Sequence, residues 1–242
     1  MEYILSTDNL TKTYKKVKAV DSINLHLNKG DIYGFIGRNG AGKTTTLKML
    51  CGLANPTSGT FSLFGQSYED TIANNAFSRI GCLIEEPGLY GNMTAFDNVY
   101  LKCLSAGIKD KEYARNLLKL VDLDETGKKK AKGFSLGMRQ RLGIAIALVG
   151  EPELLILDEP TNGLDPQGIL EIRETILKLN KEKNITFIIS SHILEELSKI
   201  ATRYGIIDKG HLLEELSAEE LNSKADNLEE YYFNLTGGIS RG

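Results

Sequence analysis

The stretch Gly37-Arg-Asn-Gly-Ala-Gly-Lys-Thr44 decides the fold, because it joins two segments of different regular structure. Residues 31–36 before it (DIYGFI) are mostly apolar and predict a buried strand. Residues 43–51, which overlap its end (KTTTLKMLC), predict a helix. A glycine-rich turn that leads a strand directly into a helix indicates an α/β protein.

The turn also matches the pattern G-x-x-x-x-G-K-[ST], whose chemistry is the binding of a polyphosphate. Glycines let the backbone fold back with its N–H groups pointing inward, and the helix N-terminus adds about half a positive charge. We expect Lys43 to reach the β- and γ-phosphates and Thr44 to place its hydroxyl on Mg²⁺. The expected nucleotide-binding residues of the turn are Gly37, Arg38, Asn39, Gly40, Ala41, Gly42, Lys43, Thr44 and Thr45.

A pair of carboxylates forms a second candidate site. Residues 154–157 (LLIL) predict a strand buried on both faces, and Asp158 and Glu159 follow at its C-terminal end. Ligands bind at that end of the strands in open α/β sheets. Because adjacent strand residues point to opposite sides, the two acids should have different roles. Asp158 suits the Mg²⁺ shell, held through water, and Glu159 suits positioning and deprotonating an attacking water.

The rest of the chain alternates between strand and helix patterns, with a helical block over residues 94–149. Thr94 with Asp97, Asp110 and Ser135 are expected to cap the helices of this block, and Asp165 caps a helix over 166–181. The other expected elements are strands over residues 23–27, 59–64, 79–84 and 185–190, a helix over 192–200, a hairpin over 203–213, and one helix in the polar tail.

Composition excludes several classes of protein. The 242 residues include 29 Lys and Arg against 32 Asp and Glu, so a dedicated nucleic-acid binder is not expected. The sequence has no run of about 18 apolar residues, which is the length needed to cross a bilayer. Its start, MEYILSTDNL, lacks the basic region of a secretory signal. Cys51, Cys82 and Cys103 have neither zinc nor disulfide spacing, so we expect reduced core thiols of a cytosolic protein.

Three further motifs complete a pattern over about residues 2–215 that resembles the nucleotide-binding subunit of an ATP-binding cassette (ABC) transporter. Phe134-Ser-Leu-Gly-Met-Arg-Gln-Arg141 stands where this family has its signature L-S-G-G-Q. Asn162-Gly-Leu-Asp165-Pro resembles the D-loop, and Ile188-Ile-Ser-Ser-His192 resembles the strand end that carries the switch histidine. Tyr14 stands where the family places an aromatic residue that stacks on adenine.

The resemblance implies a single ABC ATPase domain with a particular internal division. A P-loop NTPase core with a small antiparallel β subdomain would cover about residues 1–90 and 150–215. A helical subdomain over 91–149 would carry the signature, and residues 216–242 would form a C-terminal tail.

The resemblance also implies ATP and Mg²⁺ as cofactors and ATP hydrolysis as the reaction. Glu159 would act as the base and His192 as the switch residue. Two copies would form an ATP-dependent homodimer in which Ser135 and Gly137 of one copy face the ATP of the other. Ser135 is expected to cap a helix whose N–H groups aim at the γ-phosphate.

Two sites depart from the family pattern. Glu85, in the segment Gly81–Pro87, stands where the family has the Q-loop glutamine, so a carboxylate would replace a neutral carbonyl beside Mg²⁺. In the signature, Leu136 and Met138 replace a glycine and a glutamine, and Leu136 is expected to point away from the phosphate. The two departures together resemble a subgroup of bacterial exporters that protect cells against bacitracin or lantibiotics.

The expected function is therefore an ATPase subunit that powers export, with peptide antibiotics as the candidate cargo, through transmembrane permease subunits on separate chains. We expect it to be cytoplasmic and peripheral on the inner face of the cell membrane, without a nucleic-acid partner. The alternative is a soluble ABC-type ATPase that is not coupled to transport. A GTPase would need a guanine-reading N-K-x-D string, which we do not expect in this chain.

Overall fold

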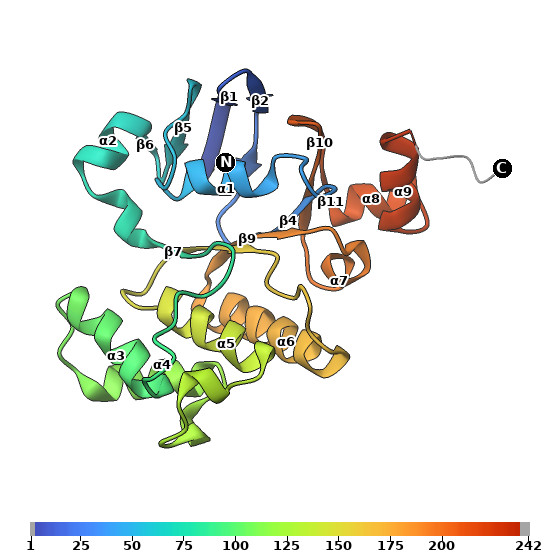
Figure 1. The fold of residues 1–242 in the computed structure, drawn as a ribbon. Helices are drawn as coiled ribbons and strands as arrows, with labels where there is room; N and C mark the ends of the chain where they lie inside the picture. Colours follow the sequence, from blue (N-terminus) through green and yellow to red (C-terminus); the bar gives the residue numbers. More distant parts are fainter. Residues whose placement is uncertain (1–2, 238–242) are drawn as a thin grey trace. The chain divides into compact units, whose positions relative to one another are not determined.

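The computed structural model describes residues 3–237, which divide into two compact units (Figure 1). The first unit contains the described residues up to Phe77 and those from Thr186 onward, and the second runs from Ser78 to Ile185. Both units combine strands with helices. The expected α/β class is thereby confirmed.

A mainly parallel sheet lies in the first unit. Strand β4 (Ile32–Ile36) pairs in parallel with β9 (Thr186–Ser191) and with β10 (Arg203–Asp208), and β11 (His211–Ser217) returns antiparallel to β10. Every residue of β4 and β9 is buried, as in strands that are covered on both faces. The strands expected over 31–36 and 185–190 and the terminal hairpin are confirmed to within a few residues.

The two helices that follow these parallel strands differ in how well the sequence predicts them. Helix α1 (Lys43–Leu50) follows β4 as expected. Helix α7 (Leu194–Ser198) is shorter than the predicted 192–200. The prediction is wrong at its start because Ile193 is extended and its N–H donates to the Ser191 hydroxyl at 2.9 Å, which holds the chain out of helical geometry.

A second sheet of the first unit is antiparallel. Its strands are β1 (Leu5–Tyr14), β2 (Val17–Ile23), β3 (His26–Leu27), β5 (Ser58–Leu63) and β6 (Gln66–Ser67). The single strand expected over 23–27 is wrong, because the Thr7 hydroxyl donates to the Ile23 carbonyl and accepts from the Leu25 N–H, both at 2.8 Å. These two bonds separate β2 from β3, although the predicted apolar face is buried as expected.

Short helices complete the first unit. Helix α2 (Tyr68–Ala73) follows β6, and the chain passes from the first unit to the second within the 3-10 turn Ala76–Arg79. The tail contains two helices, α8 (Ala218–Lys224) and α9 (Leu228–Leu235), where one was expected.

The second unit pairs β7 (Ile80–Leu83) in parallel with β8 (Leu154–Asp158). Its helices are α3 (Ala95–Ser105), α4 (Lys111–Leu120), α5 (Leu136–Ala147) and α6 (Pro166–Lys183), with 3-10 turns at Asp124–Thr126 and Ala131–Gly133. The predicted caps are confirmed. Each cap side chain accepts a backbone N–H from the first turn, and the caps are Thr94, Asp110, Ser135 and Asp165.

Two expectations from the sequence need correction. All three cysteines are free, and Cys103 is buried, but Cys82 is exposed on β7, so it is not a core thiol. The letters N-K-x-D do occur, at Asn28-Lys29-Gly30-Asp31. There the Asn28 N–H and side-chain amide both donate to the Asp31 carboxylate at 3.1 Å, so the string closes a turn ahead of β4.

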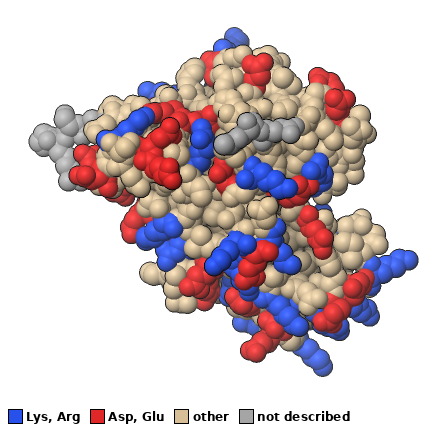
Figure 2. Space-filling model, turned by 180° about the vertical axis from the view of Figure 1, so that it is seen from behind, with Lys and Arg blue, Asp and Glu red and all other residues tan. Residues whose placement is uncertain are grey.

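The surface carries both signs of charge. On the face shown in Figure 2, acidic and basic side chains are interspersed. Among residues 3–237, no helix is both long enough and apolar enough to cross a membrane.

Gly205 of β10 is required by the neighbouring strand. Tyr33 of β4 is fully buried, and its hydroxyl donates to Glu215 Oε1 at 2.8 Å. Burial raises the pKa of Tyr33 well above its usual value, and the Glu215 carboxylate raises it further, so the phenol stays a donor. A Cβ at position 205 would overlap the Tyr33 hydroxyl and lie 2.7 Å from Cζ of its ring.

We therefore expect Gly205→Ala to lower the free energy of unfolding by about 1–3 kcal/mol, the usual range for overpacking a core. Urea unfolding measures the change. Gly88→Ala is the control, because no atom lies within 4 Å of the added methyl group. Equal unfolding free energies for the two variants would contradict the packing described here.

Candidate functional site

The phosphate loop runs between β4 and α1 in the first unit and is shaped by two close approaches. At Gly42, with φ 112°, a Cβ would lie 2.6 Å from the Ala19 carbonyl oxygen. At Gly37, a Cβ would lie 2.8 Å from Cγ2 of Ile207 on β10. Gly40 also has a left-handed backbone, with φ 82°. The loop thus needs glycine for conformation at two positions and for space at two.

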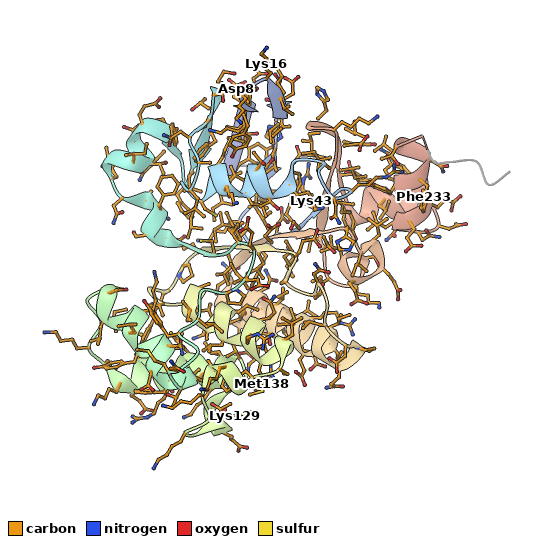
Figure 3. The ribbon with its side chains drawn as sticks, in the orientation of Figure 1. Asp8, Lys16, Lys43, Lys129, Met138 and Phe233 are labelled. Atoms are coloured by element: carbon orange, nitrogen blue, oxygen red, sulfur yellow. The ribbon has the colours of Figure 1, made fainter. Side chains whose placement is uncertain are left out.

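Lys43 lies over the loop that precedes it. Its side chain is buried, and Nζ donates to the Gly37 carbonyl at 2.6 Å and to the Arg38 carbonyl at 3.4 Å (Figure 3). Helix α1 begins at Lys43 without a side-chain cap and has no acidic residue in its first turn. No acidic side chain of the first turn therefore neutralises the positive end of the helix dipole. A helix start of this kind favours the binding of an anion.

The structure brings His192 to the start of this loop. Ile36 of β4 pairs with Ser191 of β9, so Gly37 and His192 leave neighbouring strands at the same edge. Together they line a pocket of about 240 Å³, whose other residues are Ile36, Arg38, Asn39, Leu194 and Tyr232. Asn39 and Arg38 are exposed, while Ala41 is buried and Thr44 and Thr45 are half-buried at the start of α1.

Tyr14 ends β1 in the antiparallel sheet and is 48% exposed. The ammonium of Lys12 lies 5.2 Å from the centre of its ring. An exposed ring can accept a flat base, but Tyr14 does not line the pocket beside the loop. Its contact with adenine stays a prediction.

The carboxylates of the second unit lie at the ends of two paired strands. Asp158 is the last residue of β8 and is 5% exposed. Glu159 follows with φ 50° and is half-buried. Leu83 of β7 pairs with Leu157, so Glu85, which is exposed with φ 63°, also follows this edge.

The pleat of β8 therefore does not set the directions of both side chains, as was expected, and the different roles of Asp158 and Glu159 stay predictions. The strand ends at Asp158, and the left-handed backbone of Glu159, not the pleat, sets the direction of its side chain. Over the described residues, no three acidic, histidine or cysteine side chains form a cluster that could hold a metal by themselves. A buried Asp158 still fits Mg²⁺, which usually takes one or two carboxylates and completes its shell with water and phosphate oxygens.

The signature and the D-loop meet within the second unit. Ser135 caps α5, with its Oγ accepting from the Met138 N–H at 3.2 Å. Residues 135–138, 163–165, 167 and 168 line a pocket of about 490 Å³ with Arg141 and Glu171. Gly137 is buried, and a Cβ there would lie 3.7 Å from Cα of Gly168.

The two residues that depart from the family signature have partners in the same unit. Cδ2 of Leu136 lies 3.3 Å from where a Cβ of Gly163 would be, so this side chain points to the D-loop. Nζ of Lys129 lies 4.0 Å from Sδ of Met138 (Figure 3).

Two features near these sites were not predicted from the sequence. Arg141 of α5 pairs with Glu171 of α6 at 3.1 Å and donates to the carbonyls of Val121 and Asp122. Tyr232 of α9 lines the pocket beside the phosphate loop. The spacing of Leu228 and Tyr232, four residues apart in a polar tail, is the pattern that could have indicated a buried helix face.

Gly163 has φ 74°, and its contact with Leu136 can be tested by a double-mutant cycle. We expect Gly163→Ala to cost about 1–2 kcal/mol of unfolding free energy, because alanine is strained in this conformation. In a Leu136→Ala background the same change should cost at least about 0.5 kcal/mol less, as for other residues in contact. Urea unfolding of the four proteins gives the coupling, and strict additivity would contradict the contact.

The sequence of this chain is similar to those of known transport proteins. Residues 20–162 match the ABC transporter family. The bacitracin transport ATP-binding protein BcrA of Enterococcus faecalis is 48% identical over 224 residues, which are 93% of this chain and 72% of that protein. The lantibiotic transport ATP-binding protein SrtF of Streptococcus pyogenes is 42% identical over 231 residues, 96% of each chain.

Solved structures agree with the sequence relatives. An ATP-binding subunit of an ABC transporter gives a TM-score of 0.83 at 28% identity, covering 96% of this chain and 99% of that one. A dimeric ATP-binding cassette in a post-hydrolysis state with ADP and phosphate gives 0.77 at 26% identity, covering 88% and 98%. With its P-loop fold and phosphate loop, this chain is an ATP-binding, ATP-hydrolysing cassette that belongs to the ABC transporter family.

Proposed function

We propose that this chain powers the export of a peptide antibiotic of the bacitracin or lantibiotic kind, through transmembrane permease subunits on separate chains. The observation that carries ATP use is the buried Lys43 over an uncapped helix start. The transported class is supported by the 48% identity to a bacitracin transport ATP-binding protein and the 42% identity to a lantibiotic transport ATP-binding protein. In this role the chain would lie on the inner face of the membrane.

The phosphate loop would hold the triphosphate through its backbone N–H groups and the Lys43 ammonium. Tyr14 would stack on the adenine. Mg²⁺, held by the Thr44 hydroxyl and by Asp158 through water, with Glu85 close by, would neutralise charge on the phosphates. Glu85 adds a second carboxylate at the edge where β7 and β8 end, which favours tighter metal binding than a neutral glutamine would give.

Glu159 would accept a proton from the attacking water, whose oxygen forms a bond to the γ-phosphorus as the bond to the β-phosphate oxygen breaks. His192 would position the γ-phosphate, since it stands at the start of the phosphate loop. The left-handed backbone at Glu159 holds its side chain in a direction that the strand alone does not provide.

A second copy of the chain would complete the site. The cap of α5 at Ser135, together with Gly137, presents a helix start to the ATP of the partner, while Leu136 is turned to the D-loop. Two ATP molecules would then join the copies, and hydrolysis would weaken that junction and open the dimer. An ABC-type ATPase that is not coupled to transport is disfavoured, because both relatives named above are transport proteins.

Lys43→Ala should abolish measurable ATP binding, because it removes the ammonium that faces the phosphates. Equilibrium binding of a non-hydrolysable ATP analogue measures this. Lys48→Ala, in the last turn of the same helix, is the matched control and should bind as the native chain does. Native affinity in Lys43→Ala would exclude the loop as the phosphate site.

Glu159→Gln should bind ATP but hydrolyse it at least about 10²-fold more slowly, since general-base catalysis contributes about that factor. The variant should also form an ATP-dependent dimer on a sizing column. The exposed Glu151→Gln serves as the control.

The same variant tests the transport role in cells. Bacteria that carry it together with the permease should lose resistance to the exported peptide, while Glu151→Gln keeps it. Hydrolysis by Glu159→Gln at the native rate would exclude Glu159 as the general base. If cells with Glu159→Gln resist bacitracin and lantibiotics as well as cells with the native chain do, these peptides are excluded as substrates.

A further inference from the structure

The C-terminal helix α9 turns one face toward the body of the first unit. Leu228 and Tyr232 lie on this face, one helical turn apart, and are 2% and 5% exposed. Phe233 is 52% exposed on the outside (Figure 3). The helix begins with Asn227, whose side chain accepts from the Glu230 N–H at 2.8 Å, and it packs against α7, which directly follows His192 and Ile193.

A cluster of three polar side chains includes the neighbouring residue, Tyr231, which does not line the pocket beside the phosphate loop. The Tyr231 hydroxyl donates to Glu214 Oε2 at 2.5 Å, and Lys224 Nζ donates to Glu214 Oε1 at 2.6 Å. Lys224 also contacts the Tyr231 hydroxyl at 3.3 Å. Because Glu214 is on β11 and Lys224 on α8, the cluster ties α9 to two other elements of the same unit.

Tyr232 lies against the first residues of the phosphate loop. It lines the pocket of about 240 Å³ together with Gly37, Arg38, Asn39 and His192. Its hydroxyl is buried and has no hydrogen-bond partner within residues 3–237. Burial raises the pKa of Tyr232, and Arg38 is close enough to lower it in part. The hydroxyl thus lies close to the side chain and main chain of Arg38 without meeting the geometry of a hydrogen bond.

An unpaired buried hydroxyl is destabilising, and phenylalanine would fill the same space without that cost. Within residues 3–237, five buried side-chain polar atoms lack a partner, and the Tyr232 hydroxyl is the one whose residue lines the pocket beside the phosphate loop. The Tyr232 hydroxyl is close to Arg38, the second residue of the phosphate loop.

We propose that Tyr232 is a positioning residue of the phosphate loop. Its hydroxyl completes a hydrogen bond with Arg38 when a nucleotide is bound, so helix α9 contributes to ATP affinity. This inference rests on the proposed binding of ATP phosphates by residues 37–44. It assigns a role in nucleotide binding to a segment outside the residues 20–162 that match the family.

The test compares Tyr232→Phe with Tyr231→Phe in the full chain. Tyr231→Phe removes a hydroxyl from the same helix, but one that is bonded to Glu214 away from the pocket. Three quantities are measured: the Kd of a non-hydrolysable ATP analogue, kcat and KM for ATP hydrolysis, and the unfolding temperature without nucleotide.

Tyr232→Phe should raise Kd and KM about 2- to 12-fold, the range for one hydrogen bond, with kcat within about twofold of the native value. Its unfolding temperature without nucleotide should stay the same or rise, because an unpaired buried hydroxyl is gone. Tyr231→Phe should lower the unfolding temperature and leave Kd and KM unchanged. A purely structural role for Tyr232 predicts no such separation of affinity from stability.

Unchanged Kd and KM in Tyr232→Phe, with native binding intact, would overturn the inference alone. A lowered unfolding temperature that accompanies weaker binding would also overturn it, since the hydroxyl would then be structural. If the native chain does not bind the analogue at all, the proposed phosphate site fails and the role of Tyr232 fails with it.

Discussion

The close fit of the phosphate loop against its own unit is the constraint on which the rest of the structure depends. Gly37 and Gly42 bring the main chain so near to Ile207 and Ala19 that no side chain fits between them. The loop is therefore shaped by its neighbours before a ligand binds, and α1 can begin at Lys43 directly behind it. Donors that are already in place need little reorganisation when charge arrives, which is why such a rigid turn suits a polyphosphate.

The sequence predicts those parts of the fold that are decided within a few residues. The capped helix starts at Thr94, Asp110, Ser135 and Asp165 are of this kind, because the cap and the amide it accepts lie two or three residues apart. The division of β2 from β3 is not predictable in this way. It depends on the hydroxyl of Thr7, which is distant in sequence and bonds to the backbone of Ile23, the last residue of β2, and of Leu25, which lies between β2 and β3.

The same distinction applies to the candidate site. The glycine pattern and the acids after an apolar run identify Lys43, Asp158 and Glu159 from local sequence. Neither the left-handed backbone at Glu159 nor the contact of Leu136 with Gly163 follows from that pattern. A large side chain in the signature is accommodated because a distant glycine leaves room for it, so the two positions have to be considered together.

The buried face of helix α9 could not be recognised from the composition of the C-terminal tail. Glutamate, asparagine, serine and lysine side chains make the tail from Ser217 polar as a whole, yet two positions one turn apart carry the buried face of α9. For packing alone, phenylalanine at position 232 would serve as well as tyrosine and would avoid an unpaired hydroxyl. Stabilising substitutions are easy to find in most proteins, and the usual obstacle to them is a loss of activity. A destabilising buried hydroxyl is therefore expected where an activity depends on it. The identity of residue 232, more than its burial, therefore connects the tail to the phosphate loop.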